Sequence, residues 1–506
     1  MAERIITTRE MRALDVNAEY FGISRLQLME NAGRAVATEI ASRFKPQDTK
    51  VTVFCGLGGN GGDGFVAARH LVCIGFRVEV ILAGRPSDIT NEEARRNWEA
   101  LKSLRKSLVL RETHDSSLIP DIKADVIIDA LLGIGLKSPP RPPIAQMIRK
   151  INESSAFKVA VDVPSGIDSD TGMVLTEAVK ANLTVTFHKP KPGLLKAKEY
   201  VGELIVKQIG IPEEIERFAG PGDVMIVVKP RPPEAHKGDF GRLLIVGGSE
   251  TFSGAPTLTA LAALRTGVDL VYIAAPRETA YTISSISPDL ITLKLEGDHL
   301  SMRNMSIIRS YMDRATAVAI GPGLGLHKET EEAVNEVIRA AEERKLPILL
   351  DADGLKAFAN SKRRLKTQAV LTPHLGEYMI LSGERPPDDL EERAEHVRRT
   401  AENLSAVILL KAHTDIISDG LRVKFNFTGN PGMTVGGTGD VLSGIVAALL
   451  AQGVDAFEAA VAGAFINGAA GDFVCAEKGY HMIATDLIDW IPRVINDPMS
   501  HIKLRK

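Results

Sequence analysis

Residues 51–64 of this 506-residue chain read VTVFCGLGGNGGDG, an apolar run followed directly by a glycine-rich loop. A short apolar run bounded by glycine is typical of a buried strand. The residues after the loop predict a helix from Phe65, and residues 77–82 predict a second strand. A strand, a loop, a helix and a second strand form the unit that builds parallel sheets, so this stretch predicts an α/β fold.

The same alternation of strands and helices continues along the chain. Residues 24–27 read SRLQ, a capping box that precedes apolar positions at helical spacing. Residues 189–240 are rich in proline and glycine, which indicates a domain boundary. We therefore expect two α/β domains, at residues 1–220 and 221–506, the first of them a Rossmann-like three-layer sandwich. Further strands are predicted at residues 126–129, 158–162, 183–187, 242–246, 270–274, 317–320, 348–351, 369–372 and 407–411.

The composition is that of an ordinary globular protein, with 44% hydrophobic and 25% charged residues and a net charge of −3. This charge argues against a general nucleic-acid binder. Three widely spaced cysteines fit neither a disulfide framework nor a zinc site and indicate a reducing compartment. The N-terminus lacks a signal-peptide pattern, and the longest apolar run, within residues 441–454, is too short to span a bilayer. We expect a cytoplasmic protein with no membrane or nucleic-acid partner.

The first glycine loop allows more than one interpretation. Residues 56–61 match the dinucleotide pattern G-x-G-x-x-G, which raises the possibility of a Rossmann dehydrogenase. That pattern requires an acid after the second strand, where this chain has Ala83-Gly84-Arg85, and Glu79 lies inside the strand instead. No Lys-Ser or Lys-Thr pair closes the loop, which argues against a phosphate-binding P-loop. A tight turn with Asp63 as a helix cap remains the structural alternative.

Two aspartates stand where predicted strands end. Asp129 opens the loop DALLGIG (residues 129–135), and Asp162 opens DVPSGID (residues 162–168). In an open parallel sheet the carboxyl ends of the strands meet at one edge, where ligands bind. We therefore expect these loops and the first glycine loop to form one site. The alternative is that each aspartate only caps its own loop.

A second glycine loop, VGGTGD at residues 435–440, precedes a predicted apolar helix from Val441. Bare backbone at a helix N-terminus suits an anion such as phosphate. Asp440 at this junction could take a proton from a hydroxyl that attacks a bound phosphate, or it could be a simple N-cap. Similar loops follow other predicted strands: GGSETFSGA (247–255), GPGLG (321–325), LTPHLGE (371–377) and KAHTD (411–415). The segment NPGMT (430–434) leads into the second glycine loop. Asp351 and Asp353 are expected to cap the next helix, with assistance to magnesium as the alternative.

Several motifs of the chain together resemble those of a known family. The motifs LMENAG (28–33), the loop at residues 58–64, DALLGIG and VDVPSG (161–166) resemble the NAD(P)H-hydrate epimerase domain. The second half resembles the ADP/ATP-dependent NAD(P)H-hydrate dehydratases, which have a ribokinase-like fold. The chain therefore looks like a bifunctional NAD(P)H-hydrate repair enzyme. Such enzymes interconvert the R and S hydrates of NADH and NADPH (NADHX and NADPHX) and dehydrate the S form with ADP or ATP.

For the first domain, the resemblance implies a potassium ion held by Asn60, Asp129 and Ser165. It also implies that Asp162 touches the substrate, where we expect it to act in acid/base catalysis. The chain has Gly59 where the family usually has an asparagine, so one side-chain contact is expected to be absent. The residues implied in substrate binding are Gly59, Asn60, Gly61, Gly62, Asp63, Gly133, Ile134, Gly135, Leu136, Lys137, Ser138, Pro139 and Asp162.

For the second domain, the resemblance implies a substrate site, a nucleotide site and a magnesium ion. Asp440 would be the catalytic base, and Ala412 replaces the glycine that the family usually has. The substrate would contact Ala255, Gly323, His374 and Asp440, and the nucleotide would contact Lys411, Ala412, His413, Thr414, Asp415 and Gly439. The alternative function is a small-molecule kinase joined to a regulatory dinucleotide-binding domain. Helices rich in small residues also suggest a homo-oligomer.

Overall fold

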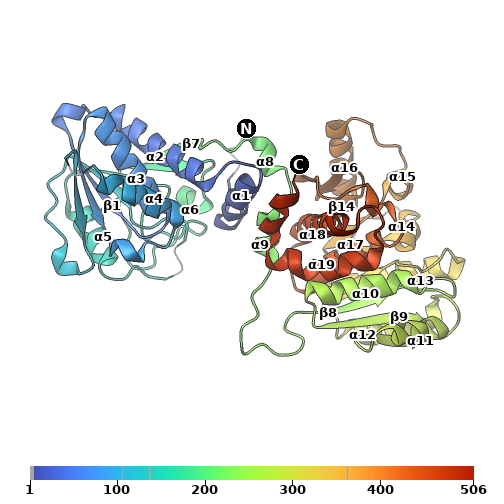
Figure 1. The fold of residues 1–506 in the computed structure, drawn as a ribbon. Helices are drawn as coiled ribbons and strands as arrows, with labels where there is room; N and C mark the ends of the chain where they lie inside the picture. Colours follow the sequence, from blue (N-terminus) through green and yellow to red (C-terminus); the bar gives the residue numbers. More distant parts are fainter. Residues whose placement is uncertain (1–4, 105, 136–137, 362, 506) are drawn as a thin grey trace. The chain divides into compact units, whose positions relative to one another are not determined.

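The computed structural model describes residues 5–104, 106–135, 138–361 and 363–505. The chain divides into two compact units, one ending at Ile215 and the other beginning at Glu216 (Figure 1). Each unit is an α/β sandwich with its own sheet. The predicted α/β class and the prediction of two domains agree with this architecture.

The first unit contains a parallel sheet with strand order β3-β2-β1-β4-β5-β6-β7. The chain order reverses between β1 and β4, so the loops after these strands flank the switch point at which open sheets bind ligands. The edge strands β3 and β7 were not predicted, because each has only three consecutive apolar residues beside charged ones and is partly exposed. The strands are β1 (Lys50–Cys55), β2 (Arg77–Leu82), β3 (Leu108–Glu112), β4 (Val126–Ala130), β5 (Phe157–Val161), β6 (Leu183–Phe187) and β7 (Glu203–Lys207).

Helices cover both faces of this sheet, as the alternation of side chains along β1 requires. Val51 and Val53 pack with α2, α3 and α4 on one face, whereas Phe54 packs with α5 on the other. The helices are α1 (Thr8–Tyr20), α2 (Arg25–Ala41), α3 (Gly59–Ile74), α4 (Glu92–Lys102), α5 (Ile144–Glu153), α6 (Pro192–Lys196), α7 (Lys198–Val201) and α8 (Glu213–Glu216). Helix α8 spans the boundary between the two units.

Helix starts show which local predictions were correct. The capping box of α2 is present, because Ser24 Oγ accepts from the Gln27 amide and the Gln27 side chain accepts from the Ser24 amide over 2.8 Å. The prediction that α3 begins at Phe65 was wrong, since the helix begins at Gly59. Helix propensity disfavours glycine, but packing against the sheet overrides that preference here. Asn60 and Asp63 therefore lie in the first turns of a helix.

The second unit contains a sheet with strand order β10-β9-β8-β11-β12-β13-β14-β15-β16. The strands from β10 to β14 are parallel, and β15 and β16 add an antiparallel hairpin. The strands are β8 (Arg242–Val246), β9 (Leu270–Pro276), β10 (Ile291–Leu295), β11 (Ala317–Ile320), β12 (Ile348–Leu350), β13 (Ala369–Leu371), β14 (Val407–Leu410), β15 (Asp415–Ser418) and β16 (Val423–Asn426).

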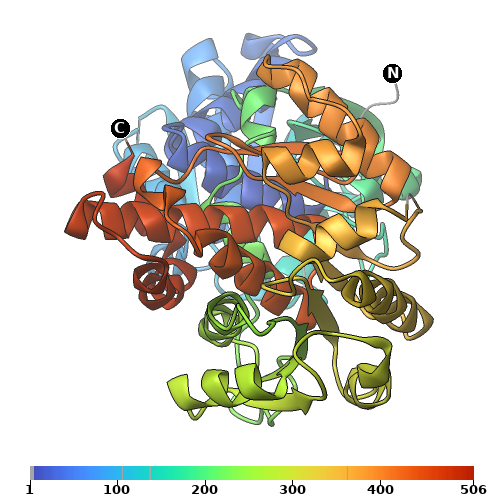
Figure 2. The same cartoon turned by 90° about the vertical axis from the view of Figure 1, so that its right-hand side faces the viewer.

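Two helical layers enclose this sheet. The layer of α10, α17, α18 and α19 covers one face, and the helices between β9 and β14 cover the other (Figures 1 and 2). The first layer comprises α10 (Gly254–Thr266), α17 (Thr438–Ala451), α18 (Ala456–Lys478) and α19 (Ala484–Asn496). The second comprises α11 (Arg277–Ile286), α12 (Met305–Met312), α13 (Lys328–Glu343), α14 (Ala352–Ala359), α15 (Leu375–Ser382) and α16 (Leu390–Leu404). Helix α9 (Pro221–Val227) packs on α18.

Helix α18 corrects one sequence-based expectation. Within the described residues it is the one helix whose length and apolar composition would suffice to cross a membrane, so a longer apolar helix than the one expected within residues 441–454 is present. However, 78% of its apolar window is buried inside the protein. The helix is apolar on all sides because it forms part of the core.

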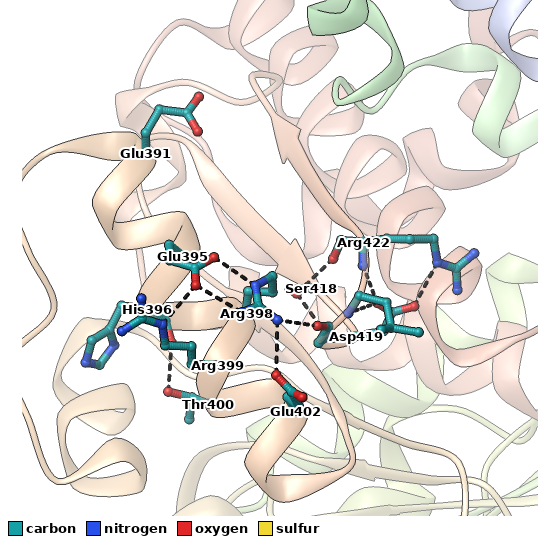
Figure 3. Close-up of polar contacts among 12 residues, drawn as sticks. Glu391, Glu395, His396, Arg398, Arg399, Thr400, Glu402, Ser418, Asp419 and Arg422 are labelled. Atoms are coloured by element: carbon teal, nitrogen blue, oxygen red, sulfur yellow. Dashed lines mark hydrogen bonds and ion pairs between the residues drawn. The ribbon is translucent and has the colours of Figure 1, made fainter. Parts of the chain in front are cut away.

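Polar contacts fix the β15–β16 hairpin against α16 (Figure 3). Arg398 donates to the Gly420 carbonyl in the hairpin turn over 2.7 Å and pairs with Glu395 and Glu402. Hydrogen bonds from Arg398 and Arg399 lower the pKa of Glu395 to about 2. These contacts act at the hairpin turn, and the predicted nucleotide loop lies at the opposite end of β15.

Candidate functional sites

Close packing of the backbone explains why two positions of the first glycine loop require glycine. A Cβ at Gly56 would lie 1.9 Å from the Leu131 carbonyl oxygen, and a Cβ at Gly61 would lie 2.0 Å from the Gly56 carbonyl oxygen. Neither position can hold a side chain, whereas a Cβ at Gly59 would meet nothing within 4 Å. Gly58 provides no side-chain cap for α3. The first amides of a helix have no intrahelical acceptor, and here no capping side chain replaces one. These free N–H groups suit an anion.

The three residues expected to hold potassium belong to one hydrogen-bond network. Ser165 Oγ donates to Asp129 Oδ1 over 2.6 Å, and the Ser165 amide donates to Asp129 Oδ2 over 2.8 Å. The Asn60 amide group donates to the Leu132 carbonyl over 3.0 Å, and this oxygen also lies 3.2 Å from Ser165 Oγ. Gly133 lies against the Asn60 side chain. The structure thus brings Asn60, Asp129 and Ser165 together.

The buried carboxylate of Asp129 gives this network its charge. Asp129 is fully buried, and burial raises its pKa to about 6 against the hydrogen bonds from Ser165 and Leu131. No cationic side chain of the described residues contributes to this shift. Buried charges in proteins are paired or bound to ions. A cation at this position would have carboxylate, hydroxyl, amide and carbonyl oxygens around it, and the described residues offer no group of three His, Cys, Asp or Glu ligands.

Asp162 follows β5 in a left-handed conformation with φ of 63°. Its Oδ1 accepts hydrogen bonds from Thr186 Oγ1 over 2.9 Å and from the Phe187 amide over 3.3 Å. The Lys191 ammonium group donates to the same oxygen over 2.5 Å. Asp162 is therefore more than a cap of its own loop, because its carboxylate forms a buried ion pair.

Sequence analysis missed Lys191. Its side chain is only 1% exposed, and Nζ also donates to Thr186 Oγ1 over 3.1 Å and to the Phe187 carbonyl over 3.0 Å. The residue lies in the segment rich in proline and glycine that indicated a domain boundary. A lysine between two prolines, directly after a predicted buried strand, was the signal that could have identified it.

Two further acids lie within electrostatic reach of this ion pair. Burial raises the pKa of Asp63 well above its usual value, and the charges of Asp162 and Asp15 add to the shift. Burial also raises the pKa of Asp15 to about 7, and Lys191 opposes the shift. Asp15 belongs to α1, which sequence analysis did not identify. Three carboxyl groups therefore lie near one ammonium group, and burial disfavours the charged forms of Asp15 and Asp63.

The loop after β4 completes the predicted phosphate-binding surface of the first unit. Gly133 and Ile134 are partly exposed, and Gly135, Ser138 and Pro139 are exposed. Leu136 and Lys137 lie outside the described residues.

In the second unit, Asp440 lies at the start of α17. The helix begins at Thr438 after Gly437, whose φ is 99°. Asp440 is half-buried and does not cap the helix. Burial raises its pKa to about 7, the charges of Asp351 and Glu377 add to this shift, and Lys411 opposes it. A carboxyl group with this pKa can exchange a proton near neutral pH.

Lys411 connects the glycine loop to the sheet. Its ammonium group pairs with Asp351 Oδ1 over 2.9 Å and lies 3.3 Å from the position that a Cβ on Gly439 would occupy. Asp351 Oδ2 accepts from Ser443 Oγ over 2.7 Å. The prediction that Asp351 caps α14 was therefore wrong, because its side chain makes no capping hydrogen bond. Its carboxylate instead orients the lysine beside the glycine loop.

The loops after β8 and β11 pack closely against each other. A Cβ at Gly247 would lie 2.6 Å from the Pro322 carbonyl oxygen, and a Cβ at Gly323 would lie 2.9 Å from Phe252 Cβ. Asp353 Oδ2 accepts from the Gly325 amide over 2.9 Å, so this acid fixes the loop after β11. Ala255, in the first turn of α10, follows the loop after β8 and is partly exposed.

His374 caps α15 through its ring. Nδ1 accepts from the Gly376 amide over 3.0 Å and from the Glu377 amide over 3.3 Å. Nδ1 therefore carries no proton, and the N–H group of the neutral ring is at Nε2. The side chain is 59% exposed, so Nε2 remains accessible to a ligand.

The predicted nucleotide loop joins β14 to β15. Ala412 and His413 are exposed, and Thr414 is partly exposed. Asp415 closes the loop: its Oδ1 accepts from the Ala412 amide and its Oδ2 accepts from Asn426, each over 3.0 Å. Burial raises the pKa of Asp415 to about 6. Ala412 has no positive φ, so the loop geometry does not require a glycine there.

Taken together, the two units define a bifunctional enzyme with two separate ligand sites at strand ends. Residues 25–193 match the family model described as YjeF-related protein N-terminus, and residues 243–493 match the model of NAD(P)H-hydrate dehydratase. The chain belongs to the family of bifunctional NAD(P)H-hydrate repair enzymes, which confirms the resemblance seen in the sequence.

Similar proteins support this membership over the full length. The bifunctional NAD(P)H-hydrate repair enzyme Nnr of Hyperthermus butylicus is 46% identical over 98% of this chain and 93% of that protein. The protein of the same name from Pyrobaculum aerophilum is 49% identical over 97% and 98%, respectively. The crystal structure of the hypothetical protein SMU.573 from Streptococcus mutans is 26% identical, with a TM-score of 0.50, and covers 56% of this chain and 99% of that one.

Proposed function

We propose that this chain repairs hydrated NADH and NADPH in two steps. The domain at residues 1–220 interconverts the R and S hydrates, and the domain at residues 221–506 dehydrates the S hydrate with ADP or ATP. The observation that carries the second assignment is Asp440, a half-buried carboxyl group at the start of α17, beside Gly439 and Lys411. We place the chain in the cytoplasm as a homo-oligomer.

The dehydratase mechanism follows from the poor leaving ability of hydroxide at neutral pH. Asp440 takes the proton of the substrate hydroxyl while the hydroxyl oxygen attacks the terminal phosphate of the nucleotide. The amides around Gly439 and the ammonium group of Lys411 stabilise the charge on the transferred phosphoryl group. Phosphate then leaves with the electrons of the C–O bond, and the lone pair of the ring nitrogen assists its departure. Loss of a proton from the ring carbon next to the one that carried the phosphate forms the double bond and restores the dihydronicotinamide.

The remaining predicted residues would position the two substrates. Ala255, Gly323 and His374 would contact the hydrate, with His374 acting as a hydrogen-bond donor through Nε2. Residues 411–415 would hold the nucleotide. Both Asp351 and Asp353 are already engaged in ion pairs and hydrogen bonds. We therefore propose that magnesium enters with the phosphates of the nucleotide, as it does at many phosphoryl-transfer sites.

In the epimerase site, Asp162 is proposed as the acid/base residue, held by Lys191. The amides of residues 59–63 and of the loop at 133–139 would bind the phosphates of the hydrated dinucleotide. Potassium would be held by Asn60, Asp129 and Ser165, where the oxygen-rich surroundings of a buried carboxylate suit a monovalent cation. The ion would neutralise that charge and fix the three segments that carry these residues.

The decisive experiment supplies S-NADPHX, ATP or ADP, and magnesium, and follows the absorbance of reduced nicotinamide. Recovery of NADPH is expected. The alternative function, a small-molecule kinase with a regulatory first domain, predicts a stable phosphorylated alcohol and no recovery of absorbance. Exchange between R and S hydrates tests the first domain in the same way, because a purely regulatory domain would bind the hydrate without converting it.

A further inference from the structure

Helix α1 is fixed beside the epimerase site. The Ile6 amide donates to the Pro190 carbonyl over 3.1 Å, and the Thr8 amide donates to Asp170 Oδ1 over 2.8 Å. The hydroxyl oxygens of Thr8 and Ser169 lie 2.6 Å apart. These partners belong to the loop that follows β5 and to the segment that carries the buried lysine. The helix precedes residue 25, where the match to the family model begins.

One turn of α1 places two charged side chains on the same side of the helix. Asp15 lies within electrostatic reach of Asp162 and Lys191, as the causes of its raised pKa show. Arg12, three residues earlier, extends to the loop after β4. Its Nη2 lies 3.4 Å from the Ile134 carbonyl oxygen and 3.9 Å from the position that a Cβ on Gly135 would occupy. The helix therefore spans from the proposed acid/base pair to the proposed phosphate loop.

The surroundings of Arg12 suit an anion. The side chain is exposed, and among the described residues no carboxylate pairs with it. A guanidinium group has five N–H donors in a planar fork that matches phosphate oxygens. Within the part of the chain that the structure describes, one weak hydrogen bond to a carbonyl uses these donors. The missing side chain at Gly135 leaves room for a ligand beside the guanidinium.

We propose that Arg12 binds a phosphate group of the hydrated dinucleotide in the epimerase site. The proposal rests on the proposed function, in which the loop after β4, here represented by Gly133, Ile134 and Gly135, contacts the substrate phosphates. Arg12 is then a binding residue that the family model does not cover, and α1 forms one wall of the site. The phosphate is either part of the pyrophosphate, common to both substrates, or the 2′-phosphate of NADPHX.

The test uses the full chain with Arg12→Ala and Arg12→Lys, and Arg34→Ala on the exposed surface of α2 as the matched control. Initial rates of epimerisation are measured with R-NADHX and R-NADPHX above the spontaneous rate. Arg12→Ala is expected to raise KM about tenfold and to change kcat less than twofold, since a charge-assisted contact outside the reacting centre is lost. Arg12→Lys should recover part of the loss, and the control should match the wild type.

The two substrates identify the phosphate. A rise in KM with both hydrates supports the pyrophosphate, and a rise with NADPHX alone supports the 2′-phosphate. An unchanged KM with both hydrates, or a loss confined to kcat, overturns the proposal. Asp162→Asn in the same assay distinguishes a failure of the proposal for Arg12 from a failure of the proposed epimerase site. If it abolishes epimerisation while Arg12→Ala has no effect, only the role of Arg12 fails, whereas an active Asp162→Asn variant contradicts the proposed site itself.

Discussion

At the scale of single residues, the carboxyl group of Asp440 shows how position determines reactivity. Burial at the helix start raises the pKa of this residue to about 7, three further acids add to the shift, and one ammonium group opposes it. Asp162 has the opposite environment, because a buried lysine pairs with it directly. The two aspartates therefore differ in the charged groups around them.

The pH dependence of dehydration should report the protonation state of Asp440. The reaction needs the carboxylate, and a pKa of about 7 means that acid converts it to the inactive protonated form. We expect kcat/KM for S-NADPHX to fall about tenfold per pH unit below pH 7 and to level off above it. A flat profile between pH 5.5 and 8 would contradict this assignment. The far-ultraviolet circular dichroism spectrum at each pH serves as the control for acid unfolding.

Lys191→Met should impair the epimerase and weaken the first unit. The substitution leaves the carboxylate of Asp162 buried without its partner, which typically costs about 3 kcal/mol of unfolding free energy. Urea unfolding followed by the fluorescence of Trp98, in the core of this unit, measures the loss. The double variant Lys191→Met/Asp162→Asn should recover part of the stability without recovering activity. Equal stability of the single and double variants would argue against the ion pair.

At the scale of elements, the glycine loop after β1 separates two kinds of glycine. Gly56 and Gly61 allow close approach of backbone segments, whereas Gly59 stands in open space. The chain therefore tolerates Gly59 where related enzymes usually have asparagine, since nothing in the packing of the loop depends on that side chain. The start of α3 at Gly59 brings Asn60 to the carbonyl of Leu132.

Gly61→Ala and Gly59→Ala form a matched pair at this loop. The first should disrupt the loop, because its Cβ would lie 2.0 Å from a carbonyl oxygen, and should reduce epimerase kcat/KM by more than a hundredfold. The second should change activity less than threefold and should stabilise α3 slightly, since alanine is the better helix former. Comparable activity of both variants would show that the loop can move away from the added methyl group.

At the scale of the whole molecule, two α/β units each place a site at the carboxyl edge of a sheet. The switch point in the first unit lies between β1 and β4, and the strands from β8 to β14 supply the loops of the second. The contacts described for Asp162 and those described for Asp440 each come from residues of a single unit. The two activities should therefore be separable.

Asp162→Asn and Asp440→Asn test this separation with the two hydrates. Asp440→Asn should lower dehydration of S-NADPHX at least a thousandfold and leave epimerisation intact. Asp162→Asn should leave dehydration of the S hydrate unchanged but slow the recovery of NADPH from the R hydrate to the spontaneous rate of epimerisation. Loss of both activities in either variant would refute independent sites.

The sequence by itself determined most strands, both glycine loops and the aspartates at the strand ends. Those features depend on local patterns: apolar runs form buried strands, glycine permits bare backbone, and parallel strands direct their carboxyl ends to one edge. Five strands went unpredicted, β3, β7, β10, β15 and β16, and the edge strands among them lack the continuous apolar pattern of the central strands.

Tertiary structure alone decided which charged groups meet. Lys191 pairs with an aspartate 29 positions earlier, and Lys411 pairs with Asp351 across 60 positions. Asp351 looked like a helix cap in the sequence, because capping depends on neighbours along the chain, but its carboxylate is used by a distant lysine. Arg12 and Asp15 belong to a helix whose place beside the site is fixed by hydrogen bonds to residues more than 150 positions away. Local sequence does not specify such contacts, since they arise only when the sheet brings separate loops to the same edge.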